Sequence, residues 1–270
     1  MLAGKHLVIT GVLTRQSIAY AVAEEALRHG AELVLTSYGR AGSITRRAAQ
    51  GLPGPPAVLE LDVTKPEDFG QLRNDLSERW ERIDGVVHAI AGAPWDALGG
   101  GFLEASTASA VEVFLVSAVS LRDLTVALLP LMERGGSIVG LDFDASVAWP
   151  VYDWMGVAKA SLESIGRYLA RDLGGRGIRV NLVAAGPIRT VSASGGLPGF
   201  DAMGRGWDAQ APLGWDTDDP STVAGGVCFM LSDWSAGVTG EILRVDGGYR
   251  ALGAPAAPWA ELARKYTESR

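Results

Sequence analysis

Cysteine, histidine and basic residues are all scarce in this 270-residue chain. The single cysteine, Cys228, excludes an intramolecular disulfide and is typical of a small buried side chain in a reducing compartment. The three histidines, His6, His29 and His88, lie on different predicted elements without metal-ligand spacing, so we expect no metal site. Lys and Arg number 24 against 31 Asp and Glu, a net charge of −7 without a long block of one sign, which argues against nucleic-acid binding.

An N-terminal secretory signal and a charge-free hydrophobic run are also missing. The first five residues lead straight into a strand-like stretch, without the apolar segment and cleavage site of a signal peptide. The longest apolar stretch, residues 110–132, contains Glu112, Arg122 and Asp123, which would be costly at the centre of a bilayer. We therefore predict a buried helix there, no membrane partner, and a cytoplasmic protein.

Short apolar runs alternate with longer segments of helical periodicity, the pattern of parallel strands joined by crossover helices. Hydrophobic residues make up 47% of the chain, and most of the short runs are nearly continuously apolar, as strands covered on both faces must be. We predict a single-domain α/β fold, a Rossmann-type doubly wound parallel sheet. The predicted strands are residues 5–10, 32–36, 57–61, 85–88, 137–141, 179–182 and 242–245, and the predicted helices are residues 17–28, 42–50, 66–80, 106–132, 155–173 and 220–231.

Three segments do not fit this alternation. Residues 93–105 are rich in glycine, and residues 186–217 are rich in glycine, proline and tryptophan. Loops of this kind above a sheet usually cover a ligand. The tail, residues 255–270, follows a Gly/Ala/Pro stretch, and its sequence is compatible with one short helix or with disorder. We predict one domain, residues 1–254, followed by that tail.

The first predicted strand leads through Gly11 into a helix that begins near Ser17. A glycine lets the backbone approach a ligand closely, and free amides at a positive helix N-terminus suit a dinucleotide pyrophosphate. Ser17 can cap the helix and also donate to a phosphate. The loop is not the usual G-x-G-x-x-G, because Leu13 and Gln16 occupy glycine positions. Taken alone, this loop is as compatible with an ordinary strand-to-helix turn as with a dinucleotide site.

Further fragments follow the later predicted strands. Asp62 and Val63 come after the third strand, where an acidic side chain and its backbone can meet an adenine ring. The fourth strand ends in mostly small residues around Ile90, which would let a flat ribosyl-nicotinamide lie close to the chain. The last strand ends in Val-Asp-Gly-Gly at residues 245–248. Each fragment alone is compatible with a turn, but their joint order predicts a nicotinamide-dinucleotide site.

Three stretches carry the most specific pattern in the chain. They are Ser-Ile-Val-Gly-Leu-Asp-Phe-Asp at residues 137–144, Tyr-Asp-Trp-Met-Gly-Val-Ala-Lys at residues 152–159 and Ala-Ala-Gly-Pro-Ile-Arg-Thr at residues 184–190. With them, residues 2–248 resemble the short-chain dehydrogenase/reductase superfamily, and more closely its enoyl-acyl-carrier-protein reductase branch of the mycobacterial type. The resemblance implies that residues 1–254 form an NAD-binding enoyl reductase-like domain.

The distance between a tyrosine and a lysine is the most diagnostic feature of these stretches. Ordinary members of the superfamily carry a tyrosine four residues before the active-site lysine, where this chain has Met155. In the enoyl reductase branch six residues separate the two, as they separate Tyr152 from Lys159 here. The resemblance therefore implies that Tyr152 and Lys159 are catalytic, together with Phe143.

The implied chemistry accounts for these residue types. Hydride delivered to the β-carbon of a 2-enoyl thioester leaves an enolate, whose oxygen needs a preorganised donor such as Tyr152. Lys159 would hold the nicotinamide ribose and place positive charge near the anion, and Phe143 would position substrate and exclude water. Singly, a Tyr or Lys on a helix is more often a packed aromatic or a solvated cation. The small residues beside Lys159 favour contact with a ligand, whereas Asp142 is expected to be structural.

The resemblance also indicates how the cofactor is held. Ile188 would meet the nicotinamide carboxamide and Thr190 the pyrophosphate. Tyr38 lies where the family's NADH users carry an aromatic residue, which favours NADH, while Arg40 leaves NADPH open. The predicted cofactor-binding residues are Gly11, Ser17, Ile18, Tyr38, Asp62, Val63, Ile90, Lys159, Ile188 and Thr190.

Two departures from the family concern ligand binding. Ala89 replaces a serine near the cofactor phosphates, which predicts a weaker hold on the cofactor. Trp149 is bulkier than the family's usual residue before Pro150, and the loop over residues 190–207 is shorter than in the mycobacterial long-chain enzymes. We therefore expect a shallower or differently shaped acyl pocket.

The sequence thus predicts an NADH-dependent enoyl-acyl-carrier-protein reductase. Its substrate would be a trans-2-enoyl thioester of acyl carrier protein or CoA, in fatty-acid or related acyl-chain biosynthesis, and the resemblance implies a homotetramer. Two alternatives stay open. A carbonyl reductase of specialised metabolism is disfavoured by Met155, and a catalytically silent NAD-binding protein is disfavoured by the retained Tyr152 and Lys159.

Overall fold

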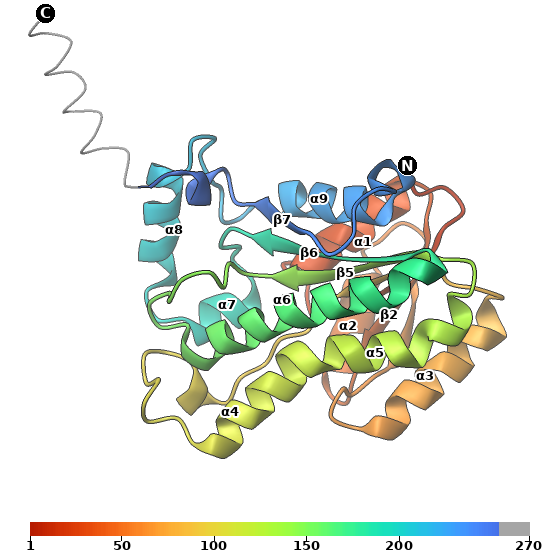
Figure 1. Cartoon of the computed structure of the whole chain (residues 1–270), viewed down its shortest axis with the longest axis horizontal. Helices are drawn as coiled ribbons and strands as arrows, with labels where there is room; N and C mark the ends of the chain where they lie inside the picture. Colours follow the sequence, from red (N-terminus) through yellow and green to blue (C-terminus); the bar gives the residue numbers. More distant parts are fainter. Residues whose placement is uncertain (254–270) are drawn as a thin grey trace, which may run out of the picture.

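The protein is built on one parallel sheet with helices on both faces (Figure 1). The computed structural model describes residues 1–253, and the predicted tail, residues 255–270, lies outside this range. The strand order is β3-β2-β1-β4-β5-β6-β7, and all neighbouring strands are parallel. This confirms the predicted doubly wound Rossmann-type fold. The strands are β1 (His6–Ile9), β2 (Glu32–Ser37), β3 (Ala57–Glu60), β4 (Gly85–His88), β5 (Gly136–Asp142), β6 (Ile178–Ala185) and β7 (Ile242–Val245).

The helices form two layers that enclose the sheet. One layer contains α1 (Ile18–Arg28), α2 (Ala41–Ala49) and α9 (Ser221–Leu231), and the other contains α3 (Pro66–Arg79), α5 (Ser120–Leu128) and α6 (Asp153–Leu173). Side chains alternate along a strand, so Leu7 and Ile9 pack with the first layer while Val8 packs with the second. Because both faces are covered, most strand positions are apolar.

The long helix predicted over residues 106–132 is interrupted. A π-helical turn, Leu115–Val119, separates α4 (Thr107–Phe114) from α5, and the short 3-10 helix Leu129–Leu131 follows. Taken together, the helical segment Thr107–Leu131 is long and apolar enough to cross a membrane, by length and composition alone. Leu121 and its neighbours on the inner face are buried in the core, whereas the outer face carries exposed apolar side chains. The predicted burial therefore holds for one face only.

Two helices lie in the segment that the sequence indicated as a long loop. They are α7 (Val191–Gly196) and α8 (Phe200–Gln210). The buried residues of α8, Phe200, Gly204 and Trp207, follow the spacing of one helix face. That signal was present in the sequence, but the high glycine content of the segment obscured it.

Candidate active site

A cavity of about 1070 Å³ opens at the carboxyl ends of the central strands. The strand order reverses between β1 and β4, and ligands of such sheets bind in the crevice at this point. Both segments predicted to cover a ligand contribute to it, with Leu98 from one and Pro198 from the other. The predicted site residues that line the cavity are Gly11, Ser17, Ile18, Ile90, Phe143, Tyr152, Lys159, Ile188 and Thr190.

The turn after β1 requires glycine at position 11. Gly11 has a φ of +79°, and an added Cβ would collide with the carbonyl oxygen of Ala89 at the end of β4. The two strand ends therefore approach each other closely. Ser17 stands at the N-cap of α1 but does not cap it as predicted. Its Oγ instead accepts hydrogen bonds from the amides of Leu13 and Thr14 at 3.1 and 3.0 Å, which orders the loop.

Three predicted cofactor residues lie outside the cavity lining. Tyr38 follows β2 and is 55% exposed, and Asp62 and Val63 follow β3 at the same edge of the sheet. Glu60, which the sequence analysis missed, accepts a 2.7 Å hydrogen bond from the amide of Gly39. A carboxylate thus lies beside the end of β2, where Rossmann folds place the acid that binds the adenosine ribose. The sequence did not reveal it because Glu60 comes from the neighbouring strand.

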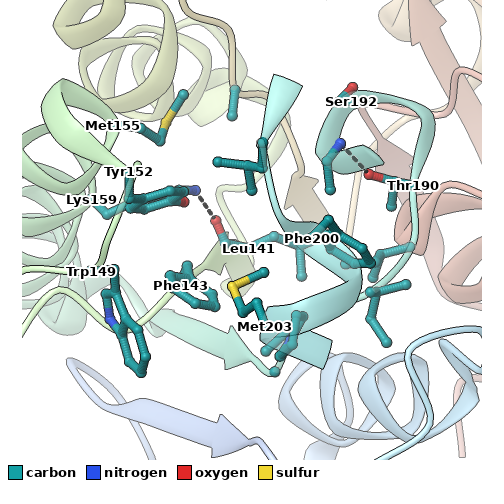
Figure 2. Close-up of a pocket in the computed structure, with 18 of the residues that line it drawn as sticks. Leu141, Phe143, Trp149, Tyr152, Met155, Lys159, Thr190, Ser192, Phe200 and Met203 are labelled. Atoms are coloured by element: carbon teal, nitrogen blue, oxygen red, sulfur yellow. Dashed lines mark hydrogen bonds between the residues drawn. The ribbon is translucent and has the colours of Figure 1, made fainter. Parts of the chain in front are cut away.

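Tyr152 and Lys159 face the same cavity from one helix. Tyr152 is the N-cap residue of α6, and Lys159 follows two helical turns later on the same side. Lys159 is buried, and its Nζ donates a 2.8 Å hydrogen bond to the carbonyl oxygen of Leu141 on β5. Figure 2 shows both side chains at the wall of the pocket. Met155, one turn before Lys159, also lines the cavity.

The backbone on either side of Tyr152 is strained. Val151 has a φ of +58° and Asp153 a φ of +45°, in the left-handed region that is costly for residues other than glycine. The Gly99 amide donates a 2.9 Å hydrogen bond to the Val151 carbonyl, and the Gly100 amide donates to the Asp153 carboxylate. The loop over residues 93–105 therefore holds both strained residues. Strain maintained in this way clusters at functional sites.

Phe143, Ile188 and Thr190 complete the predicted set within the cavity. The ring centroid of Phe143 lies 5.0 Å from that of Tyr152. Ile188 follows β6 and is buried in the cavity wall. Thr190 caps α7, with its Oγ accepting a 3.0 Å hydrogen bond from the amide of Ala193, and it lies across the pocket from Lys159 in Figure 2. Residues from three elements thus converge on one space.

Desolvation controls protonation in the site. It raises the pKa of Tyr152 well above the usual range, assisted by Asp142, so the hydroxyl remains a hydrogen-bond donor. Desolvation lowers the pKa of Lys159, and Asp142 opposes this fall. Burial raises the pKa of Asp142 to about 7 against the pull of Lys159. Within residues 1–253, neither carboxylate oxygen of Asp142 has a hydrogen-bond partner, so this residue is an electrostatic neighbour of the lysine.

Sequence comparison identifies the family. A family model described as enoyl-(acyl carrier protein) reductase matches residues 11–250. The chain belongs to this family. It is 43% identical over 261 residues to an enoyl-acyl-carrier-protein reductase (NADH) of Mycolicibacterium smegmatis, and 42% identical over 260 residues to that of Mycobacterium avium; each alignment covers 92% of this chain and 97% of the relative. It is 39% identical over 257 residues to the Rickettsia conorii enzyme, covering 94% of this chain and 97% of the relative. The predicted resemblance is confirmed.

The site of this family member contains residues that the sequence analysis did not select. Trp207 on α8 and Tyr249 after β7 both line the cavity. The helical spacing of α8 could have indicated Trp207, whereas nothing local distinguishes Tyr249. In the part of the chain that the structure describes, no group of three or more His, Cys, Asp or Glu could hold a metal ion.

Proposed function

We propose that this reductase uses NADH to saturate the 2,3 double bond of a trans-2-enoyl thioester, in fatty-acid or related acyl-chain biosynthesis. The acyl chain would be carried on acyl carrier protein or coenzyme A. The observation that carries the proposal is that Tyr152, at the N-cap of α6, and Lys159, two turns later, face one cavity at the carboxyl ends of the strands. The relatives, which are NADH-dependent enoyl-acyl-carrier-protein reductases by name, support the same reaction and cofactor.

The residues at the cavity fit a dinucleotide. Gly11 and Ser17 lie at the N-terminus of α1, where a pyrophosphate finds backbone amides and the positive end of the helix. Lys159 would hold the nicotinamide ribose, together with Ile188 after β6 and Thr190 at the start of α7. Tyr38, Asp62 and Val63 would meet the adenosine half further along the sheet edge, and Ile18 and Ile90 would line its path. When bound, NADH supplies the hydride that adds to the β-carbon of the enoyl group.

Tyr152 then acts on the thioester carbonyl. As negative charge develops on that oxygen, the Tyr152 hydroxyl donates a hydrogen bond to it, which stabilises the enolate-like transition state. Its raised pKa keeps the proton on the hydroxyl, so the proton that the α-carbon takes up to complete the saturation would come from water. The Lys159 ammonium, held by Leu141, adds positive charge nearby. Phe143 packs beside Tyr152 and reduces access of water to the reacting atoms.

The test is the fall in NADH absorbance with trans-2-enoyl thioesters of increasing length, presented on CoA and on acyl carrier protein. Turnover is expected with at least the crotonyl or octenoyl thioester. Absence of turnover with every thioester would contradict the proposal. Reduction of ketones alone would identify a carbonyl reductase, and cofactor binding without turnover of any substrate would identify a silent NAD-binding protein.

We also propose that the protein is a cytoplasmic homotetramer. Helices α4, α5 and α6 and the π-helical turn expose apolar side chains that a single copy leaves in solvent: Val111, Phe114, Leu115, Val126 and Val157. Contiguous exposed apolar surface is typical of an interface between identical subunits. Light scattering should give four times the mass of the chain, and Leu115→Lys should reduce it. A monomeric wild-type protein would contradict the proposed assembly.

A further inference from the structure

Four aromatic side chains form one wall of the cavity next to Tyr152. We call Phe143, Trp149, Trp207 and Tyr249 the aromatic wall; all four line the cavity. Trp207 and Tyr249 are stacked with ring centroids 3.9 Å apart, and Trp149 lies 5.2 Å from Trp207 and 5.8 Å from Tyr249. Phe143 lies 5.3 Å from Trp149 and joins the cluster to Tyr152. The wall therefore begins at the ring that touches the proposed catalytic tyrosine.

The two indoles of the aromatic wall are anchored through their N–H groups. Trp149 Nε1 donates a 2.7 Å hydrogen bond to the carbonyl oxygen of Asp144, and Trp207 Nε1 donates a 2.9 Å hydrogen bond to that of Asp246. A large ring held by both packing and a hydrogen bond is more rigid than an aliphatic or thioether side chain. An incoming acyl chain would have to break these bonds to displace either ring.

An ion pair between a buried carboxylate and a partly exposed arginine links the two chain segments that carry Trp149 and Tyr249. The Asp144 carboxylate is only 5% exposed, and its Oδ2 lies 3.0 Å from Arg250 Nε. Ser146 Oγ donates to Asp144 at 2.8 Å and accepts from Arg250 at 2.6 Å. Asp144 precedes Trp149 on the segment after β5, and Arg250 directly follows Tyr249 after β7. Breaking this ion pair would cost free energy, so the segment after β5 and the segment after β7 are held next to each other.

The rest of the cavity near the aromatic wall is lined by α8 and the loop that precedes it. Pro198 lies close to Gly99, and Pro198 lines the cavity together with Phe200 and Met203 of α8. In Figure 2, Phe143 lies between Trp149 and Met203. A thioester whose carbonyl oxygen meets Tyr152 would bring its acyl tail against these apolar side chains and the aromatic wall.

We infer that the aromatic wall ends the acyl pocket close to the reacting carbons, with Trp149 as the specificity-determining residue, so that the enzyme takes short-chain 2-enoyl thioesters and discriminates against long ones. This inference rests on the proposed reductase function. Trp149 is the member to test because it is partly exposed on the segment that ends at Tyr152, whereas Trp207 is buried within α8.

The experiment compares kcat/KM for crotonyl-, 2-octenoyl-, 2-dodecenoyl- and 2-hexadecenoyl-CoA in the wild type and in Trp149→Leu. The wild type should lose at least about tenfold between the octenoyl and hexadecenoyl substrates, since small volume conflicts in a fitted pocket cost that much. Trp149→Leu should raise the hexadecenoyl-to-crotonyl ratio by about tenfold. Trp234→Leu, an equal change at an indole that is 78% exposed, should leave the ratio unchanged. If Trp149→Leu does not fold, Trp149→Phe should shift the ratio in the same direction.

Each outcome decides one of the two proposals. The inference that the aromatic wall limits chain length is overturned if the wild type has equal kcat/KM for the crotonyl and hexadecenoyl substrates. It is also overturned if the hexadecenoyl-to-crotonyl ratio is unchanged in the folded Trp149 variant. Both results leave the reductase function intact. If no enoyl thioester is turned over, the reductase proposal fails. The role of the aromatic wall is then tested by calorimetric titration with saturated butyryl- and lauroyl-CoA. We expect lauroyl-CoA to bind more tightly than butyryl-CoA in Trp149→Leu but not in the wild type. The same gain in both proteins overturns the inference.

Discussion

The ammonium of Lys159 donates a 2.8 Å hydrogen bond to the main-chain carbonyl of Leu141, which ties the second turn of α6 to the end of β5. The position of this cation is therefore set by the backbone of the sheet. Asp142, next to Leu141, interacts electrostatically with Lys159 and with Tyr152 at the start of the same helix. A site organised in this way needs little rearrangement when charge develops on a substrate.

Replacing the lysine should weaken the hold on the cofactor. Lys159→Met removes a buried charged donor, and we expect the Kd for NADH to rise by about ten- to a hundredfold. Calorimetric titration with NADH measures this directly. Lys5→Met, which removes a lysine paired with Asp233 outside the cavity, should bind NADH like the wild type. Equal affinity in Lys159→Met would exclude Lys159 from the cofactor site.

Replacing the tyrosine should affect turnover rather than binding. Tyr152→Phe keeps the ring that packs on Phe143 but removes the donor to the developing oxyanion, so kcat for crotonyl-CoA should fall by about 10²- to 10³-fold. The Kd for NADH should stay within about twofold of the wild-type value, a difference close to the error of the titration. Tyr168→Phe, an exposed position on the same helix, serves as the matched control. Wild-type kcat in Tyr152→Phe would remove this hydroxyl from the mechanism.

Asp142 should make the protein less stable as the pH rises. Its pKa is about 7 in the folded protein against 3.8 as the ordinary value, so between these pH values the folded state binds more protons than the unfolded state. The free energy of unfolding should therefore fall across this interval. Asp142→Asn removes the effect: it should match the wild type at low pH and exceed it by about 2–4 kcal/mol above neutrality.

Urea unfolding at several pH values measures this difference. Glu78→Gln, an exposed change of the same charge on α3, should track the wild type at every pH. A constant offset between wild type and Asp142→Asn across the pH range would show that the carboxyl has the same pKa in the folded and unfolded chains.

Glu60 should contribute to the choice of NADH. Its carboxylate, held by the Gly39 amide beside the end of β2, would repel the 2′-phosphate of NADPH. Because the group is exposed and screened, we expect Glu60→Gln to raise kcat/KM for NADPH by only about three- to fivefold, with little change for NADH. Glu32→Gln, at the opposite end of β2, is the control. An unchanged NADH-to-NADPH ratio would assign the preference to Tyr38 and Arg40 instead.

The strands and most helices could be predicted because their signals are local. An apolar run of four to eight residues followed by a longer amphipathic segment recurs along the chain, and the structure has a strand for each predicted run. The prediction failed where local signals conflicted. Glycines made α8 look like a loop although Phe200 and Trp207 follow helical spacing, and the side chain of Ser17 bonds back to its own loop instead of capping α1.

The sequence by itself determined the fold class, the family and the pairing of Tyr152 with Lys159, since seven residues on a helix place two side chains on one face whatever surrounds them. The tertiary structure alone decided which distant residues surround that pair. Trp149 and Tyr249 are a hundred positions apart and meet only because the carboxyl ends of parallel strands share one edge of the sheet. The same packing removes water from Asp142 and brings Glu60 beside Gly39. Desolvation and long-range contacts depend on the assembled fold, so local sequence patterns cannot predict them.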